Sequence, residues 1–243
     1  MLPKKTGSIF YIHFYHTEMK NILVFCAFII LLPDVFSQSF YRISGEFSIK
    51  GKDESSAQLV IGKFYYDKNE KKIIHKNIFP EKAIWITSDT NLYKVVDNKI
   101  VSRQTIPNLT LFSMYNLVLN NQINNFGLEG SIYNLENVES MNGQVISTWL
   151  PPKNLKGFYG KLLISSKDDN LYGIIFFNTE DVILKKQFFE DYSVINGLAF
   201  PGKITEITYK DGKENYVVTT YKNIRVNDRY EESLYHFNPA DYQ

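Results

Sequence analysis

Apolar and polar residues alternate along much of the chain, which is the pattern of β-strands with one buried face. In RISGEFSIK (42–50), Ile43, Phe47 and Ile49 share one face with Gly45, and polar or charged residues occupy the other. Comparable stretches recur at close spacing, namely 57–66, 71–79, 83–86, 92–96, 134–140, 143–150, 159–166, 171–177, 182–189, 203–209 and 216–226. The pattern predicts roughly ten to twelve strands.

Short polar turns separate these strands. Asn142-Gly143 is a strong hairpin signal, and Asp211-Gly212 and the KDDN stretch at 167–170 belong to the same class. Successive hairpins with closely spaced turns are typical of an antiparallel barrel or a strongly curved sheet. No change of composition marks a second domain.

Several strands carry adjacent large apolar residues, which therefore point to both faces of the sheet. Examples are Ile73-Ile74, Leu162-Leu163 and Phe176-Phe177. A sheet with a single buried face does not need such pairs. Both faces are therefore expected to meet something apolar, whether helices, a partner or a ligand.

One segment, Gln104 to Leu128, contains no charged residue. Helical spacing of its apolar residues, with Asn108 as the expected cap, predicts a helix. The residues at this spacing are Leu111, Met114, Tyr115 and Val118, together with Phe112 and Leu119. Two interpretations stay open: a helix that completes the core, and a movable lid over an apolar cavity.

The N-terminal residues predict export. Lys20 precedes the apolar run 22–32, which is too short to span a bilayer and is followed by a cleavage-like site after Ser37. We expect an upstream extension (1–18) with the true start at Met19, a signal peptide (19–37) and one domain (38–243). Cys26 lies too early in the apolar run for a lipid-attachment cysteine. The expected location is the periplasm or the cell surface, without a membrane span after cleavage.

The expected mature chain has balanced charge and little sign of catalytic chemistry. After removal of residues 1–37, 24 basic and 24 acidic residues remain, so no basic surface for nucleic acid is expected. His75 and His236 show no metal-ligand spacing, and Asp168-Asp169 and Glu190-Asp191 are neighbours that do not converge on one face of a strand. We therefore expect no catalytic residue, no metal site, no cofactor and no enzyme activity.

Three sets of short motifs resemble the LolA-type periplasmic carriers of outer-membrane lipoproteins. The first set is Pro80, Ile84, Ser88, Asp89, Leu92 and Tyr93, preceded by Gly62, Phe64 and Tyr65. The second is FPGKITEITYKDG (200–212), and the third comprises YKNIRVND (221–228) and HFNP (236–239). The chain departs from the family in having Lys68-Asn69 where an Arg-Pro corner is usual, Asp89-Thr90 in place of an Asp-Gly turn, and no room for an N-terminal helix. It therefore resembles a divergent member.

The resemblance implies a mainly β, half-open antiparallel barrel with a few helices covering the concave face. It implies an apolar cavity that holds the hydrocarbon chains of an acylated lipoprotein or lipid, an outer-membrane acceptor, and a lid role for the 104–128 insert. The expected lipid-binding residues are Phe47, Ile49, Phe64, Trp85 and Tyr93 on the sheet and Phe112, Tyr115 and Leu119 on the lid. The alternative is a non-enzymatic module that binds an envelope protein or a glycan through a curved sheet.

Overall fold

The computed structural model describes residues 39–52, 57–108, 110–210 and 212–242. The predicted upstream extension, signal peptide, Cys26 and cleavage site lie outside these residues. The chain divides into two units, Met1–Ser39 and Phe40–Gln243, and the second contains every element described below.

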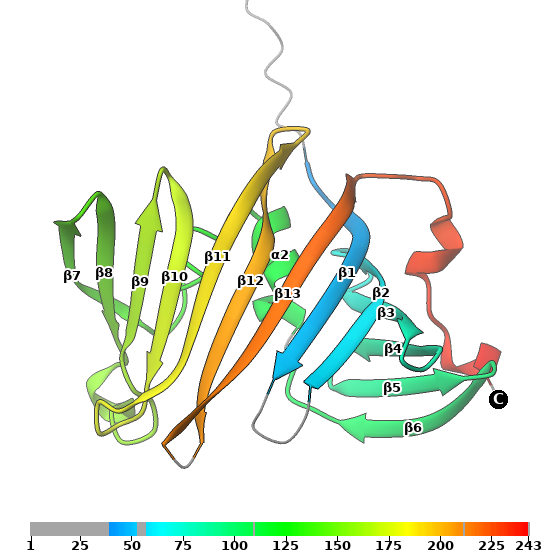
Figure 1. Cartoon of the computed structure of the whole chain (residues 1–243), viewed down its shortest axis with the longest axis horizontal. Coiled ribbons are helices and arrows are strands. Elements are labelled where there is room, and N and C mark those ends of the chain that lie inside the picture. Colours follow the sequence, from blue (N-terminus) through cyan, green and yellow to red (C-terminus); the bar gives the residue numbers. More distant parts are fainter. Residues whose placement is uncertain (1–38, 53–56, 109, 211, 243) are drawn as a thin grey trace, which may run out of the picture. The chain divides into compact units, whose positions relative to one another are not determined.

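The described part of the chain forms one open antiparallel sheet of thirteen strands in the order β6-β5-β4-β3-β2-β1-β13-β12-β11-β10-β9-β8-β7. Figure 1 shows β7 and β8 at the left end of this sheet and β4 to β6 at the right. The strands are β1 (Arg42–Lys52), β2 (Ala57–Asp67), β3 (Lys72–Phe79), β4 (Ala83–Ser88), β5 (Asn91–Val96), β6 (Lys99–Thr105), β7 (Asn134–Met141), β8 (Gln144–Leu150), β9 (Leu162–Lys167), β10 (Asn170–Phe177), β11 (Ile183–Ile195), β12 (Leu198–Lys210) and β13 (Lys213–Val226). The predicted mainly β fold with an open, curved sheet is confirmed.

Helical structure is sparse in the described residues. It consists of α2 (Met114–Leu119) and the short 3-10 turns η1 (Thr110–Phe112), η2 (Lys153–Leu155), η3 (Glu232–Tyr235) and η4 (Pro239–Tyr242). α2 lies on the far side of β12 and β13 in Figure 1 and contacts β12 and β1. The face of the sheet that carries this helix is called the α2 face below.

The main core lies between α2 and the sheet. Ile43 and Phe47 of β1 and Phe64 and Tyr66 of β2 are buried there, as the alternation in these strands predicts. Further members come from the insert and from the distant strands, including Leu117, Val118, Leu119, Ile123, Trp149, Leu162, Ile164, Leu171, Ile174, Phe189 and Phe200. The insert therefore joins the two halves of the sheet into one core.

A second core covers the opposite face of β2 to β5. Tyr65, Ile74, Ile86, Tyr93 and Val95 lie there beneath Tyr235 and Phe237 of the C-terminal segment, residues 228–242. Ile73 belongs to the first core and Ile74 to the second. For this pair the predicted apolar contact on both faces is confirmed, and on the second face the chain's own C-terminal segment supplies it.

A buried ion pair fixes the start of the sheet to this segment. Arg42 donates from Nε and Nη2 to Oδ2 of Asp67 over 3.0 and 2.8 Å. Its guanidinium also lies 4.2 Å from the centre of the Tyr235 ring. The other Asp67 oxygen, Oδ1, accepts from the backbone N–H of Asn69 at 2.8 Å, which shapes the β2–β3 turn. A desolvated ion pair with these extra bonds holds β1, β2 and η3 in a single arrangement.

Three details of the fold differ from the sequence prediction. β6 was not predicted because its apolar residues, Ile100 and Val101, are adjacent and follow no alternation. The helix is only six residues long and is capped by Ser113 rather than Asn108. The Asn108 side chain instead accepts from Thr110 Oγ1 at 2.6 Å and donates to Asp89 at 3.1 Å, so it stabilises the entry of the insert.

Candidate lipid-binding face

The insert begins with a local hydrogen-bond system that starts α2. The hydroxyl of Ser113 donates to the carbonyl of Thr110 at 2.7 Å and accepts from the backbone N–H of Asn116 at 3.3 Å. A side-chain acceptor at this position satisfies an N–H group that has no partner within the helix. Because α2 is shorter than two turns, its stability depends on packing rather than on helix propensity.

Aromatic contacts provide that packing. Tyr115 stacks on Phe64 with ring centres 4.5 Å apart and planes 16° apart. Phe47 meets His75 edge to face at 5.3 Å, and Tyr221 meets both Phe64 and Tyr115 edge to face. Aromatic pairs at these separations contribute beyond their burial.

Polar bonds inside the core attach α2 to β2 and β3. The hydroxyl of Tyr66 donates to Asn116 Oδ1 at 2.8 Å, and His75 Nε2 lies 3.1 Å from the hydroxyl of Tyr115. Desolvation lowers the pKa of His75 to about 4, so the imidazole is neutral at pH 7. Desolvation also raises the pKa of Tyr66 to about 12, which keeps its hydroxyl protonated as the donor. His75 is thus a hydrogen-bonded core histidine.

Five of the eight predicted lipid-binding residues come together around α2. Phe47, Phe64, Tyr115 and Leu119 are buried in the main core, and Ile49 packs against it. Among them, Phe64 of the sheet and Tyr115 of α2 stack directly on each other across the helix–sheet boundary. The residues predicted for the sheet and those predicted for the lid therefore form one packed layer, in which each covers the other.

The other three predicted residues lie apart from this layer. Trp85 is paired in register with His75 and so shares the α2 face, where the Lys94 amine lies 5.4 Å from its ring centre. Tyr93 lies on the opposite face and packs against Phe237, with ring centres 5.2 Å apart. Phe112, in η1, is 61% exposed.

Residues 120–133 continue the insert across the second half of the sheet. Phe126 packs against Phe176 at 6.0 Å and Phe189 at 6.3 Å between ring centres. The hydroxyl of Tyr133 donates to the carbonyl of Gly160 at 3.1 Å. This part of the insert therefore covers β10 and β11 on the α2 face.

Beyond the insert, the α2 face ends in an exposed apolar strip, defined as Leu135, Val138 and Val145. These side chains are 51, 52 and 48% exposed. Leu135 is paired with Trp149, and Val138 and Val145 occupy the same face of the β7–β8 hairpin. Sequence reasoning missed this strip because only the register across the Asn142-Gly143 turn shows that the three residues share a face.

The strip continues a cross-strand row of large apolar side chains. Leu135 pairs with Trp149, Trp149 with Leu162, Leu162 with Phe176, and Phe176 with Lys185. Four steps between neighbouring strands span roughly 19 Å. Lys185 ends the row with its amine 4.7 Å from the centre of the Phe176 ring and 3.4 Å from Glu206. The row is covered by the insert in its middle and open at the β7–β8 end.

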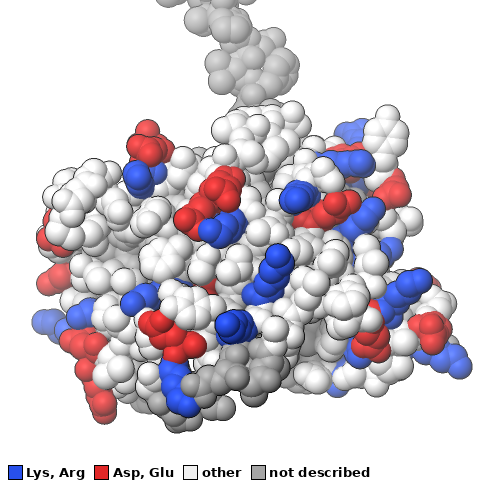
Figure 2. Space-filling model, in the orientation of Figure 1, with Lys and Arg blue, Asp and Glu red and all other residues white. Residues whose placement is uncertain are grey.

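The opposite face has a different character. Figure 2 views the molecule from this side, where basic and acidic side chains are interspersed. Lys203 and Glu190 pair at 2.8 Å on this side, and Ser48 and Thr220 share a hydrogen bond of 3.0 Å. The central strands β1, β13, β12 and β11 therefore present paired charged and polar side chains on this face.

None of the helices in the described residues has the length and hydropathy needed to cross a bilayer. Likewise, no group of three His, Cys, Asp or Glu side chains in this part of the chain lies close enough together to hold a metal ion.

Solved structures with a similar fold were found, although neither a protein-family model nor a curated protein matches the sequence. A LolA superfamily protein from Nitrosomonas europaea aligns with a TM-score of 0.55 and 13% identity over 83% of this chain and 92% of its own. An outer membrane lipoprotein-sorting protein domain from Vibrio parahaemolyticus aligns with a TM-score of 0.53 and 12% identity over 81% and 89%. A DUF1329 family protein from Desulfovibrio piger aligns with a TM-score of 0.51 and 11% identity over 85% and 93%.

These alignments extend over most of both chains in each comparison. At 11 to 13% identity they establish architecture. The resemblance predicted from the motifs is thus confirmed at the level of the fold, and the chain has the fold of the LolA superfamily.

Proposed function

We propose that this protein is a non-enzymatic carrier that binds the hydrocarbon chains of a lipid or an acylated lipoprotein on the α2 face. The exposed apolar strip carries the proposal. Leu135 at the end of the row and its neighbours Val138 and Val145 are each about half exposed, and they lie beside the buried Trp149 and Leu162. Contiguous exposed apolar groups beside a buried apolar row are characteristic of a binding surface.

The insert supplies the lid in this proposal. Phe64 and Tyr115 now cover each other, so an acyl chain reaches the middle of the face only when part of the insert moves. Each buried methylene contributes about 0.8 kcal/mol, so a long chain can offset the loss of several side-chain contacts. Competition between insert and ligand for one surface also allows release.

The remaining assignments follow from the same proposal. The protein is exported to the periplasm or the cell surface after cleavage behind Ser37, carries its cargo without covalent chemistry, and delivers it to an outer-membrane acceptor. Support comes from the sequence of residues 19–37 and from the fold shared with a lipoprotein-sorting domain. No cofactor is required for this role.

Lipid extraction tests the proposal directly. Gently purified protein is expected to release acyl-containing molecules that mass spectrometry identifies, and the delipidated protein is expected to bind a fluorescent fatty-acid probe. The double variant Val138→Asp/Val145→Asp should weaken probe binding about tenfold or more, because two charges then line the open end of the row.

A matched control is available on the other face. Ile61 of β2 is 40% exposed and is paired in register with Ser48, whose side chain lies on the face opposite α2. Ile61→Asp is therefore expected to bind the probe like the unchanged protein. Extracts without acyl chains, together with no binding of the probe, would favour the interaction module over a carrier.

A further inference from the structure

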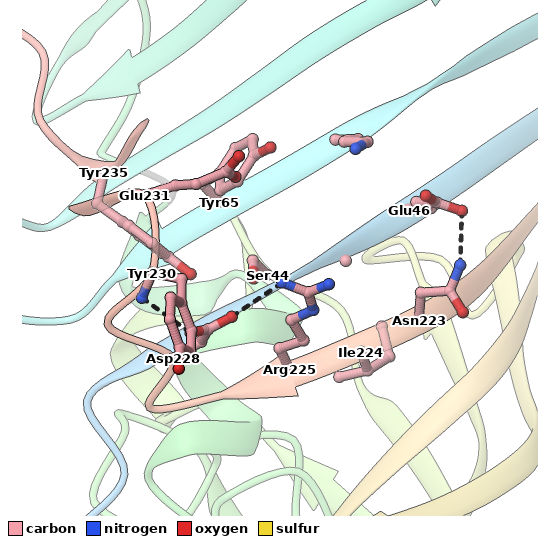
Figure 3. A pocket seen from close by; sticks show the side chains of 12 residues that line it. Ser44, Glu46, Tyr65, Asn223, Ile224, Arg225, Asp228, Tyr230, Glu231 and Tyr235 are labelled. Carbon is pink, nitrogen blue, oxygen red and sulfur yellow. Dashed lines mark hydrogen bonds and ion pairs between the residues drawn. The ribbon is translucent and has the colours of Figure 1, made fainter. Parts of the chain in front are cut away.

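A polar cavity of about 350 Å³ lies on the face opposite α2, between β1, β2, β13 and the C-terminal segment. Figure 3 shows its side chains converging from these elements, with Tyr65 and Tyr235 on one side and Glu46 and Asn223 on the other. This volume falls within the range of small-molecule sites. The acyl-carrier proposal uses none of the cavity's side chains.

A β-bulge in β13 shapes the cavity. Ser44 pairs with Arg225 and Glu46 with Lys222, so two residues of β13, Asn223 and Ile224, stand opposite Gly45 alone. Asn223 has a φ of 53°, and its amide donates to Glu46 Oε2 at 2.9 Å. Bulges of this kind redirect side chains and are frequent beside binding sites.

Charges of both signs line the cavity, and several are already neutralised. Arg225 pairs with Asp228 at 3.1 Å, and Glu46 accepts from Asn223. Among the described residues, no ion-pair partner of Lys63 or of the Glu231 carboxylate lies within 4.0 Å. The cavity thus offers hydrogen-bond donors and acceptors in close alternation without a dominant charge, which suits a neutral polyol better than a phosphate or a metal ion.

Tyrosine side chains complete the site. Tyr65 and Tyr235 are buried, with ring centres 5.5 Å apart, and the hydroxyl of Tyr65 has no hydrogen-bond partner among the described residues. Tyr230 stands at the rim and is 81% exposed, and its backbone N–H donates to Asp228 Oδ1 at 2.9 Å. An exposed ring beside polar groups matches a pyranose, which presents C–H groups on its faces and hydroxyls around its edge.

We propose that this cavity binds one or two neutral sugar units of a saccharide, with Tyr230 stacking on a sugar face and Glu46, Asn223, Arg225 and Glu231 bonding to its hydroxyls. The site lies on the face opposite the acyl-binding surface. Because the two surfaces are on opposite faces, the protein can hold a glycan whether or not an acyl chain occupies the α2 face. The saccharide proposal does not depend on the carrier proposal.

Saturation-transfer difference NMR on the purified protein tests this site with four probes: maltose, cellobiose, lactose and N,N′-diacetylchitobiose. At least one is expected to receive saturation from the protein. Tyr230→Ala should lower that transfer about fivefold, as expected for the loss of an aromatic contact, whereas Tyr230→Phe keeps the ring and should retain it. Tyr216→Ala, which removes an exposed tyrosine elsewhere on β13, is the matched control.

Three results would overturn the proposal. They are no transfer to any of the four sugars, transfer that Tyr230→Ala leaves unchanged, and stronger binding of phosphocholine than of every sugar. The last result would assign the cavity to a zwitterionic headgroup. Because Tyr230 makes no core contact, the Ala variant is expected to fold, and its urea midpoint verifies this.

Discussion

Phe64 of β2 and Tyr115 of α2 lie nearly parallel with ring centres 4.5 Å apart, so the predicted ligand surface and the predicted lid share one aromatic contact. Core packing and lid function therefore do not exclude each other in this fold. The insert is core in the arrangement described here, and a lid role requires that its contacts be exchanged for those of a ligand.

The two ends of the helical part of the insert should respond differently to a charge. Leu119→Asp places a carboxylate at a position that is 4% exposed and is expected to lower the free energy of unfolding by about 3 kcal/mol or more. Phe112→Asp changes a residue that is 61% exposed and should cost less than about 1 kcal/mol. Urea denaturation followed by tryptophan fluorescence measures both. Equal losses would mean that Phe112 is as much a part of the core as Leu119.

Stability should depend on His75 at mildly acidic pH. Its pKa falls from 6.5 to about 4 on folding, so between these values the unfolded chain binds a proton that the folded chain does not. Stability is therefore expected to fall as the pH drops from 6.5 to 4, by at most about 3 kcal/mol. Urea titrations at several pH values measure the slope. His75→Gln should flatten this slope, and a slope that His75→Gln leaves unchanged would contradict the assignment.

The buried ion pair predicts a large cost for removing one charge. Asp67→Asn leaves the Arg42 guanidinium buried without its carboxylate and is expected to lower the free energy of unfolding by about 3 kcal/mol or more. Glu81→Gln is the matched control, because Glu81 and Lys94 form an exposed pair worth less than about 1 kcal/mol. Urea midpoints compare the two changes. Similar losses in both variants would show that Arg42 finds other compensation, for example from Glu232 at 3.6 Å.

N-terminal sequencing tests the export prediction. Protein secreted by an expressing bacterium should begin at Gln38, because the apolar run 22–32 and the residues before Ser37 fit a signal peptide. Substituting Ser37 by Phe should block this cleavage and leave a longer product. A mature chain that begins near Met1 would rule out the predicted signal peptide.

Much of the fold could be predicted from local patterns. The alternation of Ile43, Phe47 and Ile49 placed one face of β1 in the core, and Asn142-Gly143 placed the β7–β8 hairpin. The adjacent residues Ile73 and Ile74 correctly predicted that both faces of this strand meet apolar side chains. These features depend on period and turn chemistry, which neighbouring residues determine.

The candidate sites could not be predicted from the sequence, because they depend on strand register and on segments that are distant in sequence. The exposed strip requires the pairing of Leu135 with Trp149, and the polar cavity requires the bulge opposite Gly45. Tyr93 could not be assigned to the second core without knowing that Phe237, far away in sequence, lies against it. The proposed roles of the eight lipid-binding residues stay predictions.

The central pairing of β1 with β13 has a consequence for folding kinetics. β1 to β6 and β7 to β13 each form a succession of hairpins between strands that are neighbours in sequence. Ser48 and Thr220, by contrast, are 172 positions apart, so the seam between the halves closes the longest loop in the sheet. Loop closure of this length costs chain entropy before any contact compensates for it. The two meanders are thus expected to assemble first and the seam last, and until then both strands at the seam present unpaired edges to neighbouring chains.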